Sequence, residues 1–362
     1  RYKNEIIEEV PEVDAVLGTT SYGDILKAIR EAMEGKHFQE FKDIDYLPEK
    51  LGKRVLTTGG HFGYLKIAEG CDKHCTYCII PKLRGKFRSV PMERLVTQAK
   101  EMAEEGVKEL ILVAQETTVY GTDIYGKKSL HILLRELCKI KGIRWIRVLY
   151  CYPEEIYDEL IQTMKEEKKI CHYLDLPIQH ASDRILKRMG RRTTQAELVE
   201  IVNKLRREIP DIVLRTTLIS GFPGETQEDH EELMSFVDEM EFDRLGVFTY
   251  SPEEDTPAAT MPDQVAEEVK EARRDEIMEL QQEISYDKGT DRIGQELLVM
   301  IEGKVADESA YIGRTYGDAP KVDGYIFVQT GELLMTGDFA KVRVTGALEY
   351  DLIGELADEY TE

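Results

Sequence analysis

The 362-residue sequence is short of three features, each of which would define a class of protein. No run approaches the roughly 18–20 consecutive apolar residues of a membrane span, and no signal peptide opens the chain, so we expect a cytoplasmic protein. Basic residues are outnumbered, because 48 Lys and Arg stand against 70 Asp and Glu, a formal net charge of −22. A surface that acidic repels bare phosphate backbones, so a basic protein is the expected macromolecular partner unless a local basic face exists.

Cysteine is also scarce, and its six residues are unevenly placed. Cys71, Cys75 and Cys78 are crowded together, whereas the other three are far apart in the sequence: Cys138, Cys151 and Cys171. Close-set cysteines in a chain long enough to bury a large core indicate metal ligands in a reducing compartment rather than disulfides.

What the sequence does contain, from about Tyr64, is an alternation of short apolar runs with amphipathic stretches. The runs predict buried strands at Tyr64–Ala68, Glu109–Ala114, Trp145–Cys151, Tyr173–Pro177, Val213–Ser220 and Leu245–Tyr250. The amphipathic stretches predict helices at Met92–Glu105, Leu130–Lys141, Glu154–Glu167, Ala196–Glu208 and Gln227–Met240. This α/β pattern indicates a parallel sheet, either doubly wound or curled toward a barrel, with the chemistry at the carboxyl ends of the strands.

The pattern changes after Tyr250. Residues 251–263 carry three prolines and read as a connector, and Gln264–Ser285 predicts a long charged helix. Short runs rich in Val, Ile, Tyr and Gly between residues 290 and 353 predict a small antiparallel barrel of about five strands. Residues 290–362 hold six basic and fifteen acidic side chains, a net charge of −9. Near the start of the chain, Asp24–Glu34 predicts a helix, and residues 37–63 read as a loop.

The most specific motif runs from Glu69 to Cys78 with the spacing C-x3-C-x2-C, directly after the first predicted strand. Three thiolates hold three irons of a cubane cluster and leave the fourth iron open. An open iron at a barrel mouth is what one-electron cleavage of S-adenosylmethionine requires. The alternative is a zinc site that adds His74, but zinc sites usually pair two cysteines with a second couple further on, and none follows here.

This motif, with residues 66–70 before it and 79–89 after it, resembles the radical S-adenosylmethionine methylthiotransferases. The resemblance spans Tyr64 to about Ile353. It implies a partial (βα)6 TIM-like barrel followed by an OB-like TRAM barrel, a 4Fe–4S cluster on Cys71, Cys75 and Cys78, and bound S-adenosylmethionine. The implied activity is a transferase reaction, in which sulfur is inserted into an unactivated C–H bond and methylated. Tyr77 stands at the aromatic position before the third cysteine.

Segments 113–121, 176–183 and 313–320 resemble the branch of the family that modifies a ribosomal protein rather than tRNA. The implied reaction adds a methylthio group to the β-carbon of an aspartate in the basic small-subunit ribosomal protein twelve, free or within the ribosome. The alternative is a tRNA methylthiotransferase that acts on a modified adenosine. The acidic C-terminal module agrees with a basic protein partner and makes tRNA the less favoured one.

Several further residues are candidates for cofactor binding. In the family, the loop Ser220–Thr226, with Gly221 and Gly224, borders the S-adenosylmethionine pocket, although a plain tight turn would look the same. Arg215 is expected to contact the cofactor carboxylate or to fill a buried ion pair. Four polar residues stand at predicted strand ends and are expected either to contact cofactor or substrate or to be structural: Gln115, Thr117, Gln179 and His180. No general acid or base is assigned, because radical hydrogen abstraction needs none.

The basic run Lys187–Arg192 is expected to dock an acidic reductant of the flavodoxin or ferredoxin type, or only to solubilise a helix end. Complete methylthiotransferases bind a second cluster through three cysteines of an N-terminal domain. This sequence has no cysteine before Cys71, and residues 1–36 resemble only the tail of that domain. The three scattered cysteines are expected to be buried apolar residues. We therefore expect this chain to bind one cluster and cleave S-adenosylmethionine without completing sulfur insertion; roughly eight irons per chain would contradict this.

The resulting division of the chain has five parts. They are the remnant of an N-terminal domain (1–36), a linker (37–63), the radical domain (64–252), a connector with a long helix (253–289) and the TRAM domain (290–362).

Overall fold

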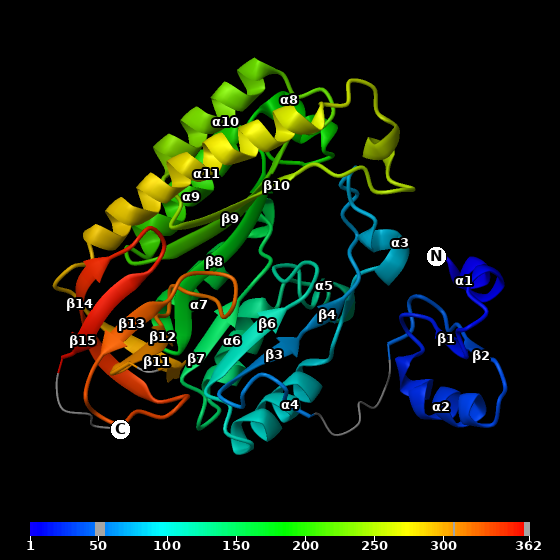
Figure 1. Cartoon of the computed structure of the whole chain (residues 1–362), viewed down its shortest axis with the longest axis horizontal. Coiled ribbons are helices and arrows are strands. Elements are labelled where there is room, and N and C mark those ends of the chain that lie inside the picture. Colours follow the sequence, from blue (N-terminus) through cyan, green and yellow to red (C-terminus); the bar gives the residue numbers. More distant parts are fainter. Residues whose placement is uncertain (48–54, 307, 358–362) are drawn as a thin grey trace.

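The computed structural model describes residues 1–47, 55–306 and 308–357, and its centre is a curled parallel sheet (Figure 1). The six strands are β3 (Phe62–Lys66), β6 (Glu109–Val113), β7 (Trp145–Val148), β8 (Ile170–Gln179), β9 (Val213–Ser220) and β10 (Arg244–Thr249). Their order is β10-β9-β8-β7-β6-β3, so every strand lies beside its predecessor in the chain. This order is that of a partial (βα)6 barrel and not of a doubly wound sheet, which confirms the predicted fold class.

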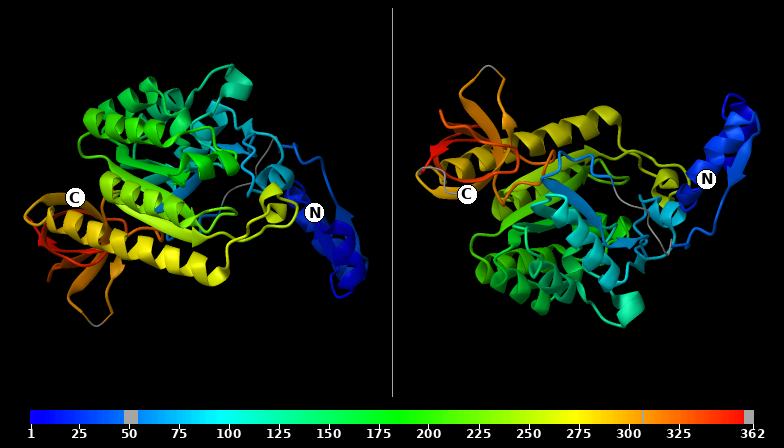
Figure 2. Two further views of the ribbon diagram at one scale, coloured as in Figure 1. Left: turned by 90° about the horizontal axis from the view of Figure 1, so that it is seen from above. Right: turned by 90° about the horizontal axis from the view of Figure 1, so that it is seen from below.

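Helices cover the outer face of this sheet (Figures 1 and 2). They are α4 (Met92–Glu104), α6 (Leu130–Cys138), α7 (Asp158–Glu166), α9 (Gln195–Glu208) and α10 (Gln227–Met240). Shorter elements stand in the connections that follow three of the strands: α5 (Thr122–Tyr125) after β6, the 3-10 turn η2 (Pro153–Glu155) after β7, and α8 (Asp183–Arg188) after β8. Thr194 and Thr226 begin α9 and α10 with capping boxes, in which the threonine hydroxyl accepts from the backbone of Glu197 or Asp229. These caps satisfy backbone N–H groups that a helix start leaves unpaired.

Side chains alternate across the sheet, and the two faces have different partners. On the outer face, residues such as Leu65, Leu110 and Ile146 pack with the helices into the main apolar core. On the inner face, a smaller cluster contains Ile111 and Tyr173 together with residues of the C-terminal module. Strands buried on both faces read as continuous apolar runs, which is why the sequence predicted them.

The C-terminal module is a closed five-stranded barrel that begins after the long helix α11 (Glu267–Thr290) and the turn η3 (Pro257–Thr260). Its strands are β11 (Glu296–Lys304), β12 (Ala310–Arg314), β13 (Ile326–Gln329), β14 (Phe339–Ala347) and β15 (Leu352–Leu356). This confirms the predicted small barrel. Helix α11 runs five residues beyond the predicted Ser285, because its last turn packs against the barrel, where a Cβ on Gly289 would lie 3.1 Å from Ala347 Cβ.

The barrel closes the amino-terminal end of the parallel sheet. Glu109 at the start of β6 is fully buried and bonds Arg147 Nε at 2.8 Å and Arg314 Nη2 at 2.7 Å. The rings of Trp145 and Phe339 meet edge to face with centroids 4.9 Å apart. Arg314 and Phe339 belong to barrel strands β12 and β14, whereas Glu109 and Trp145 begin sheet strands β6 and β7. The barrel therefore covers the end of the sheet opposite the cysteine loop.

The N-terminal segment lies at the side of the molecule away from the barrel (Figure 2). It comprises α1 (Lys3–Glu9), β1 (Ala15–Leu17), η1 (Tyr22–Asp24), α2 (Ile25–Met33) and β2 (Phe38–Glu40). The loop expected over residues 37–63 is wrong in part, because β2 pairs in parallel with β1 and Phe62 opens β3. A three-residue strand is too short to leave a periodic pattern in the sequence. Residues 48–54 of that expected loop lie outside the described residues.

Over the three described ranges of the chain, no helix is both long enough and apolar enough to cross a lipid bilayer.

Candidate active site

The loop that carries the three cysteines lies at the carboxyl end of β3. A short antiparallel pair, β4 (Ala68–Glu69) and β5 (Arg88–Ser89), brackets it, and α3 (Ile80–Arg84) lies between them. Gly70 opens the loop with φ of 79°, and a Cβ there would come within 2.1 Å of the Lys86 carbonyl oxygen. Only glycine fits a positive φ at so close an approach of two backbones.

Two of the three thiols are buried, those of Cys71 and Cys75, and that of Cys78 is half-buried. The backbone N–H of Cys78 donates to the Cys75 carbonyl at 3.1 Å, and that of Lys73 donates to Cys71 Sγ at 3.4 Å. Burial raises the pKa of Cys71 to about 11 and also raises the pKa of Cys78. These two thiols therefore hold their protons at neutral pH, and a bound iron would displace the protons.

These donors fit the iron–sulfur cluster that the motif implies. All six cysteines lie in the described part of the chain and none is in a disulfide. Within that part, no three His, Cys, Asp or Glu side chains converge closely enough for a single metal ion. A zinc ion would draw its thiolates to about 2.3 Å, whereas a cubane spreads three thiolates over three irons. His74, the fourth ligand of the zinc alternative, is exposed.

Aromatic side chains enclose the cysteine loop. Tyr77 meets Phe222 edge to face with ring centroids 6.3 Å apart, so it packs against the loop that follows β9. The Tyr152 hydroxyl lies 3.8 Å from Cys75 Sγ, within reach of a weak hydrogen bond to sulfur. These rings exclude water from one side of the thiols.

Two cations flank the same tyrosine. The Lys73 ammonium lies 5.0 Å and the Arg191 guanidinium 4.3 Å from the centroid of Tyr152. Lys73 also pairs with Glu154 and Glu155, and Arg191 lies 3.7 Å from Glu154. Positive charge next to thiolate ligands lowers the cost of holding an anionic cluster in a buried place. Lys73 lies inside the cysteine motif and Arg191 in the basic run, but the sequence analysis gave neither of them a role beside the thiols. Nothing in the spacing of Tyr152 or Arg191 brings them to the motif.

Gln115 and Thr117 both form hydrogen bonds with the protein backbone. Gln115 Oε1 accepts from the Gly70 backbone N–H at 2.9 Å and so holds the start of the cysteine loop. Thr117 is fully buried, and its hydroxyl lies 2.9 Å from the carbonyls of both Leu149 and Tyr150. Both residues tie together the carboxyl ends of neighbouring strands, and contact with cofactor or substrate stays a prediction for them.

Gln179 is the last residue of β8, and His180 follows it. Gln179 has φ of 75°, where the register of β8 against β9 shifts after Leu176. His180 is fully buried, and its Nδ1 accepts from the Ser182 N–H at 3.0 Å. Its Nε2 therefore carries the proton and faces Glu225 Oε2 at 3.5 Å. The structure thus brings His180 against the loop that follows β9.

The two glycines of that loop are required by packing. Gly221 and Gly224 have φ of 68° and 82°. A Cβ on Gly221 would lie 2.1 Å from Lys270 Cγ of α11, and one on Gly224 would lie 2.8 Å from the guanidinium carbon of Arg188. Protein neighbours alone therefore account for glycine at both positions.

The side chain of Glu225 connects the loop Ser220–Thr226 to helix α11 through hydrogen bonds. The sequence analysis did not identify this residue. Its Oε2 accepts from the N–H of Gly221 at 2.8 Å, and its Oε1 accepts from Arg273 Nη1 at 2.8 Å. Burial alone would raise the pKa of Glu225, but His180 and Arg273 outweigh it and keep that pKa below its ordinary value. The side chain is an internal counter-ion that fastens the loop to α11.

Arg215 forms the ion pair that was one of its two expected roles. Its Nη1 lies 2.8 Å from Asp175 Oδ1 on β8, and its Nε lies 3.4 Å from Asp323 Oδ1 in the C-terminal barrel module.

Glu116 is a second buried acid near the cysteine loop. Its Oε1 accepts from the Thr118 N–H at 3.0 Å, and its Oε2 is buried without a hydrogen-bond partner among the described residues. Burial raises the pKa of Glu116 to about 7. A glutamate just past a buried strand end was the available signal in the sequence.

The scattered cysteines do not come together. Cys151 packs in the core on the helix side of the sheet, Cys171 packs on the opposite, inner face, and Cys138 ends α6. Burial raises the pKa of Cys138 and of Cys171 to about 12. They are apolar packing residues, as expected for cysteines of this kind.

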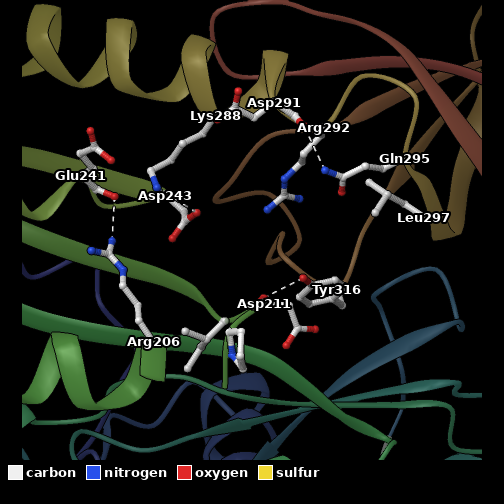
Figure 3. Close-up of a pocket in the computed structure, with 12 residues that line it drawn as sticks. Arg206, Asp211, Glu241, Asp243, Lys288, Asp291, Arg292, Gln295, Leu297 and Tyr316 are labelled. Atoms are coloured by element: carbon white, nitrogen blue, oxygen red, sulfur yellow. Dashed lines mark hydrogen bonds and ion pairs between the residues drawn. The ribbon is translucent and has the colours of Figure 1, made fainter. Parts of the chain in front are cut away.

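A separate cavity of about 470 Å³ lies between the amino-terminal end of the sheet and the C-terminal barrel (Figure 3). Arg206 donates to the Glu241 carbonyl there, and Lys288 lies 3.9 Å from Asp243. Its charges are mixed and largely paired with one another, and it lies at the end of the sheet opposite the cysteines. It is therefore not part of the candidate active site.

Comparison with known proteins identifies the family. Residues 65–237 match the model of the Radical SAM superfamily, and residues 293–357 match that of the TRAM domain. The protein named ribosomal protein uS12 methylthiotransferase RimO from Lachnoclostridium phytofermentans is 64% identical over 354 residues, which cover 98% of this chain and 80% of that protein. The protein of the same name from Clostridioides difficile is 48% identical over 359 residues, 99% of this chain and 81% of that protein. Relatives this similar, together with a radical SAM barrel, a TRAM barrel and a three-cysteine loop, show that the chain belongs to the RimO family of radical SAM methylthiotransferases.

Proposed function

We propose that this protein transfers a methylthio group to ribosomal protein uS12, at the β-carbon of an aspartate. The observation that carries the proposal is the C-x3-C-x2-C loop at the carboxyl ends of a partial barrel, in a chain 64% identical to a uS12 methylthiotransferase. The net charge of −9 over residues 290–362 supports a basic protein substrate over tRNA.

The residues around the cysteine loop support this chemistry, because they exclude water from the thiols and hold the loop in one conformation. When bound on Cys71, Cys75 and Cys78, the 4Fe–4S cluster supplies a low-potential electron for reductive cleavage of S-adenosylmethionine. The Gln115 amide holds the loop that carries the thiols, and the buried Arg191 offsets negative charge beside them.

The S-adenosylmethionine pocket is assigned to the space between the cysteine loop and the loop Ser220–Thr226. The contact of Tyr77 with Phe222 supports this, because it brings the two loops together. The approach of His180 to Glu225 adds the end of β8 as a third wall. The residues assigned to line the pocket or hold its walls are Tyr77, Gln115, Thr117, Gln179, His180, Gly221 and Gly224. Arg215 is left out, because its guanidinium is held by Asp175 and Asp323.

The electron donor is assigned as an acidic flavodoxin- or ferredoxin-type protein. Thr76, between two of the cysteines, bonds the carbonyls of Arg188 and Met189, so the basic run lies directly against the cysteine loop. Lys187 and Arg192 of this run are exposed. Exposed cations beside the cluster site would attract an acidic partner. A ribosomal substrate and such a donor would place the reaction in the cytoplasm.

The domain division proposed for the chain keeps residues 64–252 as the radical domain and 290–362 as the TRAM domain, with 253–289 as connector and long helix. Residues 1–36 are proposed as a separate N-terminal part and residues 37–63 as the linker, apart from β2, which pairs with β1, and the first two residues of β3. The sheet that ends with β10, the long α11 and the closed barrel support these boundaries.

The test is mass spectrometry of uS12. The protein, expressed as its gene encodes it and reconstituted anaerobically with iron and sulfide, is incubated with uS12, S-adenosylmethionine, reductant and sulfide. The expected product is a methylthio-sized mass increase on one aspartate. A Cys71→Ala variant should give no product, and Cys138→Ala is the matched control. Modification of tRNA with none of uS12 would overturn the proposal in favour of a tRNA methylthiotransferase.

A further inference from the structure

Two large aromatic side chains are uncovered at the carboxyl ends of the sheet strands, the end that carries the cysteine loop. Phe248, near the end of β10, is 62% exposed, and Tyr150, two residues after β7, is 50% exposed. Neighbouring residues on the same strands are buried or half-buried. Exposed aromatic residues at a protein surface are typical anchors for a binding partner.

Phe248 belongs to the inner face of the partial barrel. Leu245 and Val247 of β10 pack against the helix-side core. Side chains alternate along a strand, so Arg244, Gly246 and Phe248 share the other face. Arg244 confirms this, because its guanidinium reaches Asp318 of the C-terminal barrel module at 2.6 Å. Strand β10 is also an edge strand of the sheet, so nothing on its free side covers Phe248 among the described strands.

Tyr150 is held in a left-handed backbone conformation, with φ of 59°. Its N–H donates to Asp175 Oδ2 at 3.2 Å, and its carbonyl accepts from the Thr117 N–H at 3.1 Å and from the Thr117 hydroxyl at 2.9 Å. A bulky residue persists in this region only when its surroundings impose it, and such residues cluster at functional sites.

Asp175 links this conformation to the C-terminal barrel module. Its second oxygen, Oδ1, accepts from Arg215 Nη1 at 2.8 Å, and Arg215 Nε lies 3.4 Å from Asp323 Oδ1. Asp323 is itself fixed, because its Oδ2 accepts from the Tyr173 hydroxyl at 2.7 Å. Three nearly buried side chains thus form a continuous chain of charge-assisted contacts from the barrel module to the backbone of Tyr150.

We propose that the rings of Tyr150 and Phe248 bind the substrate protein at the carboxyl-end opening of the partial barrel. Asp175, Arg215 and Asp323 are positioning residues that hold Tyr150 in its conformation. The inference rests on the proposed function, which supplies the substrate. A loop of basic uS12 suits this opening, since aromatic faces attract Lys and Arg side chains and the chain as a whole carries a charge of −22. In this arrangement Arg215 acts through Asp175 on the substrate site and does not bind the cofactor carboxylate.

The first test measures binding rather than turnover. The dissociation constant of fluorescently labelled uS12 is determined by anisotropy for the reconstituted protein and for Y150A, Y150F and F248A. We expect Y150A and F248A to raise the Kd about tenfold, and Y150F to match the parent because the ring makes the contact. The matched control is Y22A, which removes a tyrosine of equal exposure (51%) in the N-terminal segment and should leave the Kd unchanged.

The second test separates positioning from general structure by a double-mutant cycle. D323N should weaken uS12 binding about as much as Y150A, and adding D323N to Y150A should cause no further loss, because both act through one side chain. R215K, which keeps the charge, should restore part of what R215M loses. Should D323N fail to fold, the R215K and R215M pair gives the same comparison with Y150A.

The outcomes are distinguishable. If the parent protein binds and modifies uS12 while Y150A and F248A keep its Kd within twofold, this inference is wrong and the proposed function stands. If the losses from D323N and Y150A simply add, the positioning chain is wrong. If the parent neither binds nor modifies uS12, the proposed function fails and this inference falls with it.

Discussion

Three thiol side chains, those of Cys71, Cys75 and Cys78, account for the whole protein donor set of the proposed cluster. Replacing Cys75 by Ala leaves two ligands for three irons. We expect reconstituted Cys75→Ala to lose its visible absorption and to form 5′-deoxyadenosine at a rate reduced by more than the roughly 10–100-fold typical of outer-shell losses. Cys138→Ala is the control, because Cys138 ends a helix away from the loop. Equal iron content in the two variants would contradict the assignment.

Gly70 allows a sharper test of the loop itself. Gly70 and Gly35 have similar φ, 79° and 72°, but a Cβ on Gly70 would meet the Lys86 carbonyl at 2.1 Å, whereas one on Gly35 meets nothing within 4 Å. Gly35→Ala should therefore cost about 1–2 kcal/mol of unfolding free energy, and Gly70→Ala about 3–5 kcal/mol with loss of iron uptake. Denaturant titration measures both, and equal costs would show that the close approach is not real.

Glu116 makes stability depend on pH. Burial raises its pKa from 4.5 to about 7, so the folded chain holds a proton that the unfolded chain has already released. The contribution of Glu116 to the free energy of unfolding therefore falls by about 3 kcal/mol in total as the pH rises from about 4.5 to 7. Glu116→Gln should remove this slope and be more stable than the parent at pH 8. The exposed Glu104→Gln should leave the slope unchanged, and urea midpoints from pH 5 to 8 measure both.

At the residue scale, the sequence predicts three cysteines as cluster ligands but not the side chains that surround them in the structure. The cysteines are close together in the chain, so their spacing alone points to them. Gln115 was expected either to contact cofactor or substrate or to be structural, and its amide oxygen accepts from the backbone N–H of Gly70, 45 residues away. Glu225 and Arg191 reach the site only after the strands have been placed in order, and no local pattern carries that information.

At the scale of elements, the predicted bounds of a helix or strand are correct where a residue next to its end, such as a helix cap, fixes that end. Helix α10 and strand β9 have their predicted bounds, and Thr226 supplies the cap between them. Strand β7 was expected to reach Cys151 but ends at Val148, because Tyr150 takes a positive φ imposed by Asp175 of another strand. The helix expected from Glu154 begins only at Asp158, after a 3-10 turn and two extended residues. Tertiary contacts, absent from a local pattern, moved both boundaries.

The basic run Lys187–Arg192, which begins in the last turn of α8, gives a prediction at this scale. Lys187 and Arg192 are exposed beside the cysteine loop, so K187E/R192E should slow reduction of the cluster by an acidic flavodoxin. The effect should shrink as salt rises toward 0.5 M, because screening removes long-range attraction. The control K141E/K168E makes the same charge change at exposed positions near the amino-terminal ends of the strands. Reduction by dithionite, which needs no docking, should be equal in both variants, and equal slowing with flavodoxin would refute the docking site.

For the whole molecule, the charged contacts between the sheet and the C-terminal barrel decide whether the two modules unfold together. Glu109 is fully buried between Arg147 and Arg314, and Arg314 also bonds Glu302. The two arginines outweigh the effect of burial and keep the pKa of Glu109 below its ordinary value, so the carboxylate is charged and compensated. Removing the negative charge of Glu109 leaves the buried guanidinium groups of Arg147 and Arg314 without this counter-ion. Breaking a buried ion pair in this way lowers the free energy of unfolding far more than breaking an exposed pair.

Glu109→Gln should therefore lower the free energy of unfolding by about 3–5 kcal/mol. The matched control is Glu166→Gln, which removes a carboxylate from the exposed ion pair with Arg135 and should cost no more than about 1 kcal/mol. Because Glu109 belongs to the sheet and Arg314 to the barrel, the loss should also uncouple the modules, so that barrel amides exchange hydrogen before those of β6. Denaturant titration and hydrogen exchange measure the two effects. Equal costs for the two variants, or a single exchange class in Glu109→Gln, would show that the apolar contact of Trp145 with Phe339 joins the modules without help from the charges.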